Sequence, residues 1–231
     1  MALQHITRVL SEDHIYRSLT IGLAAFLILG PVVDGVMETG KVDSYLTVAF
    51  LIFALFQITR RTSDVIIGLA LGVPAIAGGI INAVTPDTPS VNIVPVVLLG
   101  VFLGFLIWRI LRDIFSGQRI SSEQIFGAVC AYLLIGFLFA SIYGFIALVD
   151  PNAFALSDAL EDELAVKSGE RGLGVLTYFS FVTMSTLGYG DVSPVSSAAR
   201  SFAWIQAVLG QLYLAITIAA LVGAHIARNR R

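Results

Sequence analysis

Six long apolar segments set the main constraint on how this chain folds. They span residues 19–37, 44–59, 66–84, 91–110, 125–149 and 202–224. A helix needs about 20 residues to cross the hydrocarbon core of a bilayer, and all segments but the second have roughly that length. Only 13% of the residues are charged, whereas a soluble domain carries about 25%. The sequence therefore predicts an all-α integral membrane protein with six transmembrane helices.

The basic residues give these predicted helices an orientation. With both termini in the cytoplasm, ten basic residues fall on the inner side and four on the outer side. The inner set is Arg8, Arg17, Arg60, Arg61, Arg109, Arg112, Arg119, Arg228, Arg230 and Arg231. The outer set is Lys41, Lys167, Arg171 and Arg200. Because basic residues collect on the cytoplasmic side of membrane proteins, we expect both termini to be cytoplasmic.

The N-terminal segment, residues 1–17, precedes the first predicted helix. It carries apolar side chains at helical spacing, at Leu3, Ile6, Val9 and Leu10. This pattern is typical of a short helix on the inner membrane surface. A disordered cytoplasmic tail is the alternative interpretation.

The connection between the fifth and sixth segments is unusually long. It begins with an acidic stretch at Asp150, Asp158, Glu161, Asp162, Glu163 and Glu170. These acids either concentrate cations at the outer face or form an ordinary solvated loop. The apolar residues 173–184 follow. They are too few to cross a membrane, so they predict a re-entrant helix.

That helix leads directly into Thr186, Leu187, Gly188, Tyr189 and Gly190. An ion-selecting filter replaces the water shell of K+ with oxygen atoms, largely backbone carbonyls. Carbonyls that point inward at successive residues need a backbone that glycine accepts more readily than other residues. Glycine stands here at alternate positions, and the threonine adds a hydroxyl at the inner end. The C-terminal end of the preceding helix, which is negative, also favours a cation.

With Asp191 added, these residues resemble the potassium-channel signature, T-V-G-Y-G followed by Asp, with Leu187 in place of valine. The region from 121 to 227 is similar to the pore module of bacterial potassium channels. The resemblance implies K+ bound at Thr186, Leu187, Gly188 and Tyr189, and a location in the bacterial inner membrane. K+ is then the permeant ligand, and no cofactor is expected.

The same resemblance assigns supporting roles around the filter. It implies that Tyr178, Phe179 and Val182 support the filter from the pore helix, and that Tyr178 donates a hydrogen bond to Asp191. Gly210 lies where the family places the gating hinge of its inner helix. Helical spacing and the resemblance together predict cavity-lining residues at Gln211, Leu214, Ile218 and Val222.

One chain holds one copy of the signature, and a potassium filter is built from four such loops. We therefore expect a homotetramer, in which three identical subunits and membrane lipid are the partners. The predicted division is a four-helix transmembrane domain at 18–112, a linker at 113–120 and a pore domain at 121–231. Only residues 225–231 follow the sixth segment, so we expect no cytoplasmic ligand-binding domain there.

Voltage sensing requires several arginines inside the membrane. The fourth segment offers only Arg109 and Arg112, both at its cytoplasmic end, and Arg119 follows in the linker. The positive-inside bias already accounts for these charges. We therefore expect a domain without voltage-sensor charges and a channel with little voltage dependence.

Other functional classes fit the sequence less well. An intramembrane protease needs paired acids, a Ser–His pair or a zinc motif within the spans, and we find none of these in the sequence. The third segment is rich in glycine and proline, as transporter helices can be, but it has no counterpart in the other half. The formal charge of −2 gives no reason to expect nucleic acid, and we expect no soluble substrate. A non-selective monovalent cation channel remains the alternative, because Leu187 is bulkier than valine.

Overall fold

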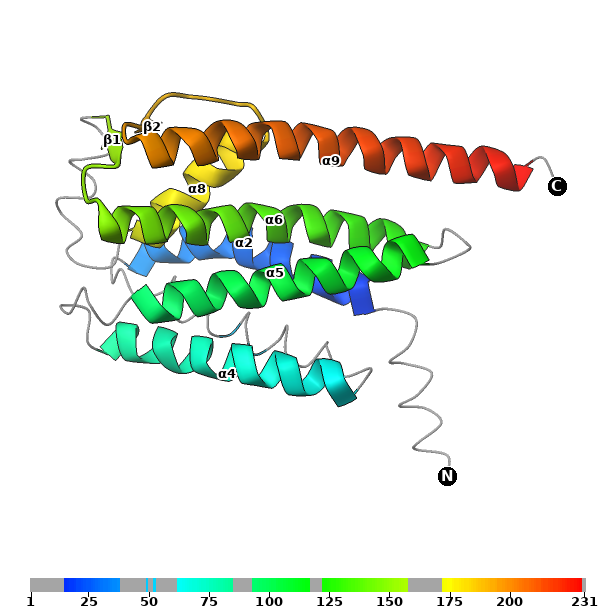
Figure 1. The fold of residues 1–231 in the computed structure, drawn as a ribbon, viewed down its shortest axis with the longest axis horizontal. Helices are drawn as coiled ribbons and strands as arrows, with labels where there is room; N and C mark the ends of the chain where they lie inside the picture. The colour runs from blue at the N-terminus through cyan, green and yellow to red at the C-terminus, as the bar shows by residue number, and fades with distance from the viewer. Residues whose placement is uncertain are drawn as a thin grey trace.

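The computed structural model describes residues 15–37, 49, 52, 62–84, 93–116, 122–157 and 172–229. Its elements are α2 (Ile15–Met37), α4 (Thr62–Val84), α5 (Ile93–Ser116), α6 (Ser122–Val149), β1 (Phe154–Leu156), α8 (Gly172–Met184), β2 (Val192–Pro194) and α9 (Ser197–Asn229). The long helices lie side by side, and α8 crosses obliquely between α6 and α9 (Figure 1). The predicted all-helical architecture is confirmed.

Three of the described helices are long and apolar enough to cross a membrane. Their candidate spans are Ile93–Ile114, Glu123–Val149 and Ser197–Ala220. The apolar stretches of α2 and α4, Tyr16–Gly30 and Ile66–Gly78, are shorter. The predicted second segment, residues 44–59, lies almost entirely outside the described residues, as do residues 1–14 of the N-terminal segment. The count of six spans therefore stays a prediction.

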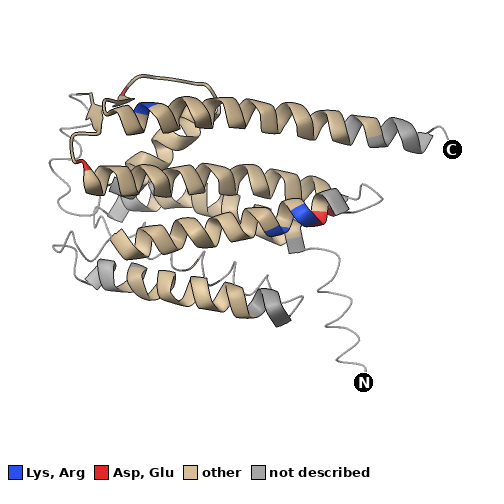
Figure 2. Ribbon diagram, viewed as in Figure 1, with Lys and Arg blue, Asp and Glu red and all other residues tan. Residues whose placement is uncertain are grey.

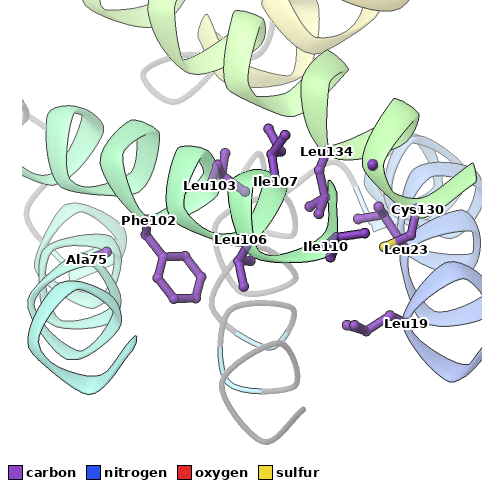
Figure 3. Close-up of a cluster of buried hydrophobic side chains, with 11 residues drawn as sticks. Leu19, Leu23, Ala75, Phe102, Leu103, Leu106, Ile107, Ile110, Cys130 and Leu134 are labelled. Carbon is purple, nitrogen blue, oxygen red and sulfur yellow. The ribbon is translucent and has the colours of Figure 1, made fainter. Parts of the chain in front are cut away.

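One hydrophobic core joins α2, α4, α5 and α6. Buried side chains from each of these helices meet in it (Figure 3). Its members are Leu19, Leu23, Ala75, Phe102, Leu103, Leu106, Ile107, Ile110, Cys130, Ala131 and Leu134. Cys130 has a packing role here, because its thiol is buried among these apolar groups. This core attaches α2, α4 and α5, which we call the peripheral helices, to α6.

Polar contacts strengthen that attachment where α2 begins, α5 ends and α6 begins. A carboxylate oxygen of Glu123 accepts hydrogen bonds from the backbone N–H groups of Tyr16 (3.0 Å) and Arg17 (3.4 Å). These N–H groups belong to the first turn of α2, where a helix has no internal partners for them. The Tyr16 hydroxyl donates to Asp113 over 2.6 Å. The start of α2 is thus fixed to both α5 and α6.

Charged residues of the described helices lie at the two ends of the bundle, and its middle is apolar (Figure 2). This distribution fits a bundle whose centre is surrounded by hydrocarbon, because an unpaired charge there is costly. At one end, Arg109 forms an ion pair with Asp113 one turn later on α5. The other end carries Asp150, Asp191 and Arg200.

A short two-stranded sheet at this second end was not predicted from the sequence. β1 follows α6, β2 precedes α9, and the two pair antiparallel with Ala155 opposite Ser193. Two further backbone bonds extend the contact, from the N–H of Ser157 to the Asp191 carbonyl (2.8 Å) and from the N–H of Val195 to the Ala153 carbonyl (2.7 Å). The sheet holds the chain just after residue 190 against the end of α6.

Gly136 allows α8 to approach α6 closely. A Cβ atom at this position would lie 2.6 Å from the aromatic ring of Phe181, well inside contact distance. We expect Gly136→Ala to lower the free energy of unfolding by about 1–3 kcal/mol, the usual cost of overpacking. Thermal unfolding of the purified protein in detergent measures the effect.

The matched control is Gly104→Ala on α5, where an added Cβ would meet no atom within 4 Å. This variant should unfold at or slightly above the wild-type temperature, since alanine favours a helix over glycine. Combining Gly136→Ala with Phe181→Leu should recover part of the loss. Equal melting temperatures for Gly136→Ala and Gly104→Ala would contradict the packing account.

Candidate functional site

The candidate site begins at the C-terminal end of α8. After Met184, the N–H groups of Ser185 and Thr186 donate to the carbonyls of Phe181 and Thr183, each over 3.0 Å. The N–H of Leu187 reaches back to the Val182 carbonyl over 2.9 Å. These bonds satisfy carbonyls of the last turn, which have no partner within the helix. The predicted short apolar helix is therefore present, and it ends just before the signature segment, which we define as residues 186–190.

The backbone of the signature segment alternates in conformation. Thr186, Gly188 and Gly190 have positive φ angles of 58°, 59° and 81°, and they are the only such residues in the described parts of the chain. A Cβ added at Gly188 or Gly190 would meet no atom within 4 Å, so space does not explain the glycines. The backbone conformation explains the glycines, because positive φ is accessible to glycine and strained for other residues.

Thr186 adopts positive φ despite its branched side chain. Such a conformation costs roughly 1–3 kcal/mol and is found mainly at functional sites. Its hydroxyl donates to the carbonyl of the preceding residue, Ser185, over 2.7 Å. The hydroxyl oxygen keeps lone pairs that can face a cation.

The signature segment is exposed along its whole length in the single chain. The side chains of Leu187 and Tyr189 are 55% and 68% exposed, although both are large and apolar. The described residues of the chain therefore give these two side chains little cover.

Asp191 is held from three sides at the end of the signature segment. The Tyr178 hydroxyl donates to its Oδ2 over 2.5 Å, which confirms the bond predicted from the sequence. The N–H of Val192 donates to Oδ1 over 3.0 Å, and the Ser157 N–H donates to the backbone carbonyl over 2.8 Å. The bond to the Asp191 carboxylate raises the pKa of Tyr178 to about 12. The phenol therefore keeps its proton, and remains a donor, throughout the physiological range.

The other two predicted supporting residues have different surroundings. The ring of Phe179 packs against Tyr143 and Phe154, with centroids 5.0 and 5.4 Å apart. It therefore joins α8 to α6 and β1. Val182 is buried, and its carbonyl accepts the bond from Leu187.

Gly210 lies at a close contact. A Cβ at this position would lie 2.7 Å from Cγ and 2.9 Å from the carbonyl oxygen of Met184, the last residue of α8. α9 is a continuous helix through this point. The hinge role of Gly210 stays a prediction. The close contact with Met184 is a second reason for a glycine at this position. Among the predicted cavity-lining residues, Gln211, Leu214 and Ile218 are exposed on α9, and the side chain of Val222 lies outside the described residues.

Sequence reasoning missed a buried polar cluster around Gln206. This side chain of α9 is fully buried and bonds to Tyr143 on α6 and to Ser180 on α8. The available signal was an amide side chain in an apolar stretch of a predicted transmembrane helix. A polar residue at such a position is costly without partners, so partners were to be expected.

The part of the chain that holds this geometry matches a known family. Residues 128–225 match the sequence model of the family described as ion channel. The match starts within α6 and covers α8, the signature segment and most of α9.

This part of the chain is similar in sequence to ion channels. We call residues 128–225 the channel module. Over 126 residues, the chain is 32% identical to the voltage-gated potassium channel Kch of Escherichia coli (strain K12). That similarity covers 52% of this chain and 26% of the relative, so the chain spans about a quarter of the relative's length. No solved structure matches the chain. The predicted resemblance to bacterial potassium channels is confirmed.

The bond between Tyr178 and Asp191 gives a prediction about how long the channel module stays conducting. Tyr178→Phe keeps the ring and removes the donor, and Asp191→Asn removes the charged acceptor. We expect currents of both variants to decline faster than wild-type currents during sustained opening, because the end of the signature segment loses a charge-assisted bond. Recordings from reconstituted bilayers measure the decline.

The double variant separates this bond from other effects of the two changes. If the residues act through one bond, combining the changes adds little to either one alone. Tyr132→Phe, a phenol on α6 outside the signature segment, is the control and should behave like wild type. Wild-type current stability in both single variants would contradict the role of the bond.

Proposed function

We propose that this chain is the subunit of a potassium-selective channel that conducts K+ passively and depends little on voltage. One observation carries the proposal: positive φ at alternate residues of an exposed segment that follows a short apolar helix in the channel module. A backbone of this kind can turn successive carbonyl oxygens to one side. Such oxygens replace the hydration shell of K+ in a filter.

In this proposal the carbonyls of residues 186–190 and the Thr186 hydroxyl coordinate K+. No cofactor takes part, because conduction needs only oxygen ligands and an open path. Tyr178 and Asp191 hold the outer end of the segment, and α8 supports its inner end. Gly210 lets α9 bend, and Gln211, Leu214, Ile218 and Val222 line the cavity below.

Four copies of the chain would complete the filter. The exposed side chains of Leu187 and Tyr189 support this, because in an assembly neighbouring subunits can cover them. Within its candidate span, only 11% of α9 is buried in the single chain, against 50% of α6. The exposed apolar residues of α9 include Trp204, Val208, Leu212 and Ile216. A homotetramer in the bacterial inner membrane gives these residues lipid and identical subunits as partners.

Weak voltage dependence is proposed from the surroundings of the two arginines of α5. Arg109 forms an ion pair with Asp113, and the Arg112 guanidinium lies over the Trp108 ring, 5.4 Å from its centroid. Both lie in the last turns of α5, at the end of the bundle. A charge held there crosses little of the membrane field. The relative Kch is named voltage-gated. Weak voltage dependence of this chain would therefore be a difference between the two proteins, and it can be measured directly.

The test of the proposed function is a bi-ionic reversal potential on the purified protein in a bilayer. We expect the permeability to K+ to exceed that to Na+ by at least about tenfold, because a carbonyl filter selects K+. Equal permeability would favour the alternative, a non-selective monovalent cation channel in which Leu187 changes the packing behind the filter. Flux that requires a coupled ion or proton would reject both.

Gly190→Ala locates the filter in the same experiment. Since alanine is strained at a φ of 81°, the variant should lose selectivity or current while assembly persists. Gly104→Ala, where the added Cβ has open space, is the matched control. Unchanged permeation in Gly190→Ala would mean that the filter lies elsewhere.

Neutralising the arginines of α5 tests the voltage proposal. The double variant Arg109→Gln, Arg112→Gln should leave the slope of the conductance–voltage curve unchanged. A charge that crosses the whole field contributes about 2.3 kcal/mol per 100 mV, so its loss would flatten the curve visibly. Asp113→Asn, which removes the partner of Arg109 and leaves both arginines, is the control. A clear loss of slope in the double variant alone would identify α5 as a voltage sensor.

A further inference from the structure

Gln206 is a buried amide in the first half of α9. Its side chain is 0% exposed, as are those of Tyr143 on α6 and Ser180 on α8. A buried polar group costs free energy unless hydrogen bonds compensate for the water it has lost. Three polar side chains from three helices therefore meet at one buried point, and the hydrogen bonds between them constrain how the helices pack.

The bonds form a closed path through the three helices. The Tyr143 hydroxyl donates to Oε1 of Gln206 over 2.6 Å. Nε2 of Gln206 donates to Oγ of Ser180 over 2.6 Å and to the Ser180 carbonyl over 3.1 Å. The Ser180 hydroxyl then donates to the Gly136 carbonyl on α6 over 2.6 Å. The path runs from α6 to α9, to α8 and back to α6.

The direction of these bonds is fixed by chemistry. A backbone carbonyl can only accept, so the atom of Gln206 that faces the Ser180 carbonyl must be the donor nitrogen. The amide oxygen is then left for Tyr143. The amide orientation follows from this network and has no equivalent alternative.

One turn further along α9, Gly210 makes the second contact with α8. Gly210 lies close to the Met184 carbonyl. It comes four residues after Gln206 and is therefore on the same side of α9. Ser180 and Met184 are likewise four residues apart on α8. Two successive turns of α9 thus face two successive turns of α8, and Met184 is two residues before Thr186.

From this arrangement we propose that Gln206 is a positioning residue, through which α9 sets the axial position and rotation of α8 and hence of the signature segment. The inference rests on the proposed function, because it gives α9 a part in selecting ions as well as in lining the pore. A shift of α9 cannot leave Ser180 in place without breaking two hydrogen bonds in an apolar environment. Gating movements of α9 therefore either occur beyond Gly210 or move α8 together with α9.

The test compares variants that remove different bonds of the path. Gln206→Met keeps the length of the side chain and removes the bonds to α8 and α6 together. Ser180→Ala removes the hydroxyl that accepts from Gln206 on α9 and donates to the Gly136 carbonyl on α6. Tyr143→Phe is the matched control, because it removes one buried bond from Gln206 and leaves the contact between α9 and α8 intact.

Hydrogen–deuterium exchange of the purified protein is the first readout, since it needs no ion flux. Amides of residues 172–184 should exchange at least about threefold faster in Gln206→Met and Ser180→Ala than in Tyr143→Phe, in keeping with coupling between residues in contact. Equal exchange in all three variants would overturn the inference. Where Gln206→Met does not fold, Gln206→Leu takes its place in the comparison with Tyr143→Phe, because Ser180→Ala also removes a bond between α8 and α6.

The ratio of K+ to Na+ permeability is the second readout, and a merely structural role would not change it. We expect Gln206→Met and Ser180→Ala to alter this ratio by at least about threefold, and the double variant to add little. An unchanged ratio in conducting variants would overturn the proposed role in selection. Faster exchange of α8 in a protein whose wild type conducts no ions would support the coupling of α9 to α8 and reject the proposed function.

Discussion

The attachment of α8 to α6 and α9 is the interaction on which the rest of the site depends. α8 has only 13 residues, and an isolated helix of that length is marginal in stability. It is held by glycines that admit close contact, at Gly136 and Gly210, and by the buried amide of Gln206. Apolar packing alone is a weak guide to orientation in lipid, where hydrocarbon surrounds every helix equally. Directional hydrogen bonds and steric fit supply the missing specificity.

These contacts of α8 determine the position of the signature segment. It begins two residues after the close contact between Gly210 and Met184, and it ends at a carboxylate held by Tyr178 and by the small sheet. Between these two fixed ends, the backbone has positive φ at Thr186, Gly188 and Gly190, at a conformational cost. Strain of this kind persists only where the surroundings hold the chain at both sides. The packing of α8 and the pairing of β1 with β2 meet that condition.

The sequence predicted the helical membrane architecture, the short helix at 173–184 and the bond from Tyr178 to Asp191. The first two rested on the length of the apolar segments, and the bond rested on the resemblance of this region to potassium channels. The β1–β2 pair could not be predicted, because two three-residue strands carry no period of their own and join positions 38 residues apart, as Ala155 and Ser193 do. The path through Gln206 likewise depends on which faces of three helices meet. The filter, hinge and cavity assignments remain proposals.

The fixing of α2 and α5 to α6 of the same chain has a consequence for how such a protein can be modified. The Glu123 carboxylate and the shared apolar core cover α6 from within one subunit, whereas α9 and the signature segment stay open. The peripheral helices therefore occupy a different side of the channel module from the surfaces still available to other copies. In the proposed homotetramer, substitutions on the outer faces of α2, α4 and α5 would therefore leave the contacts between subunits unchanged.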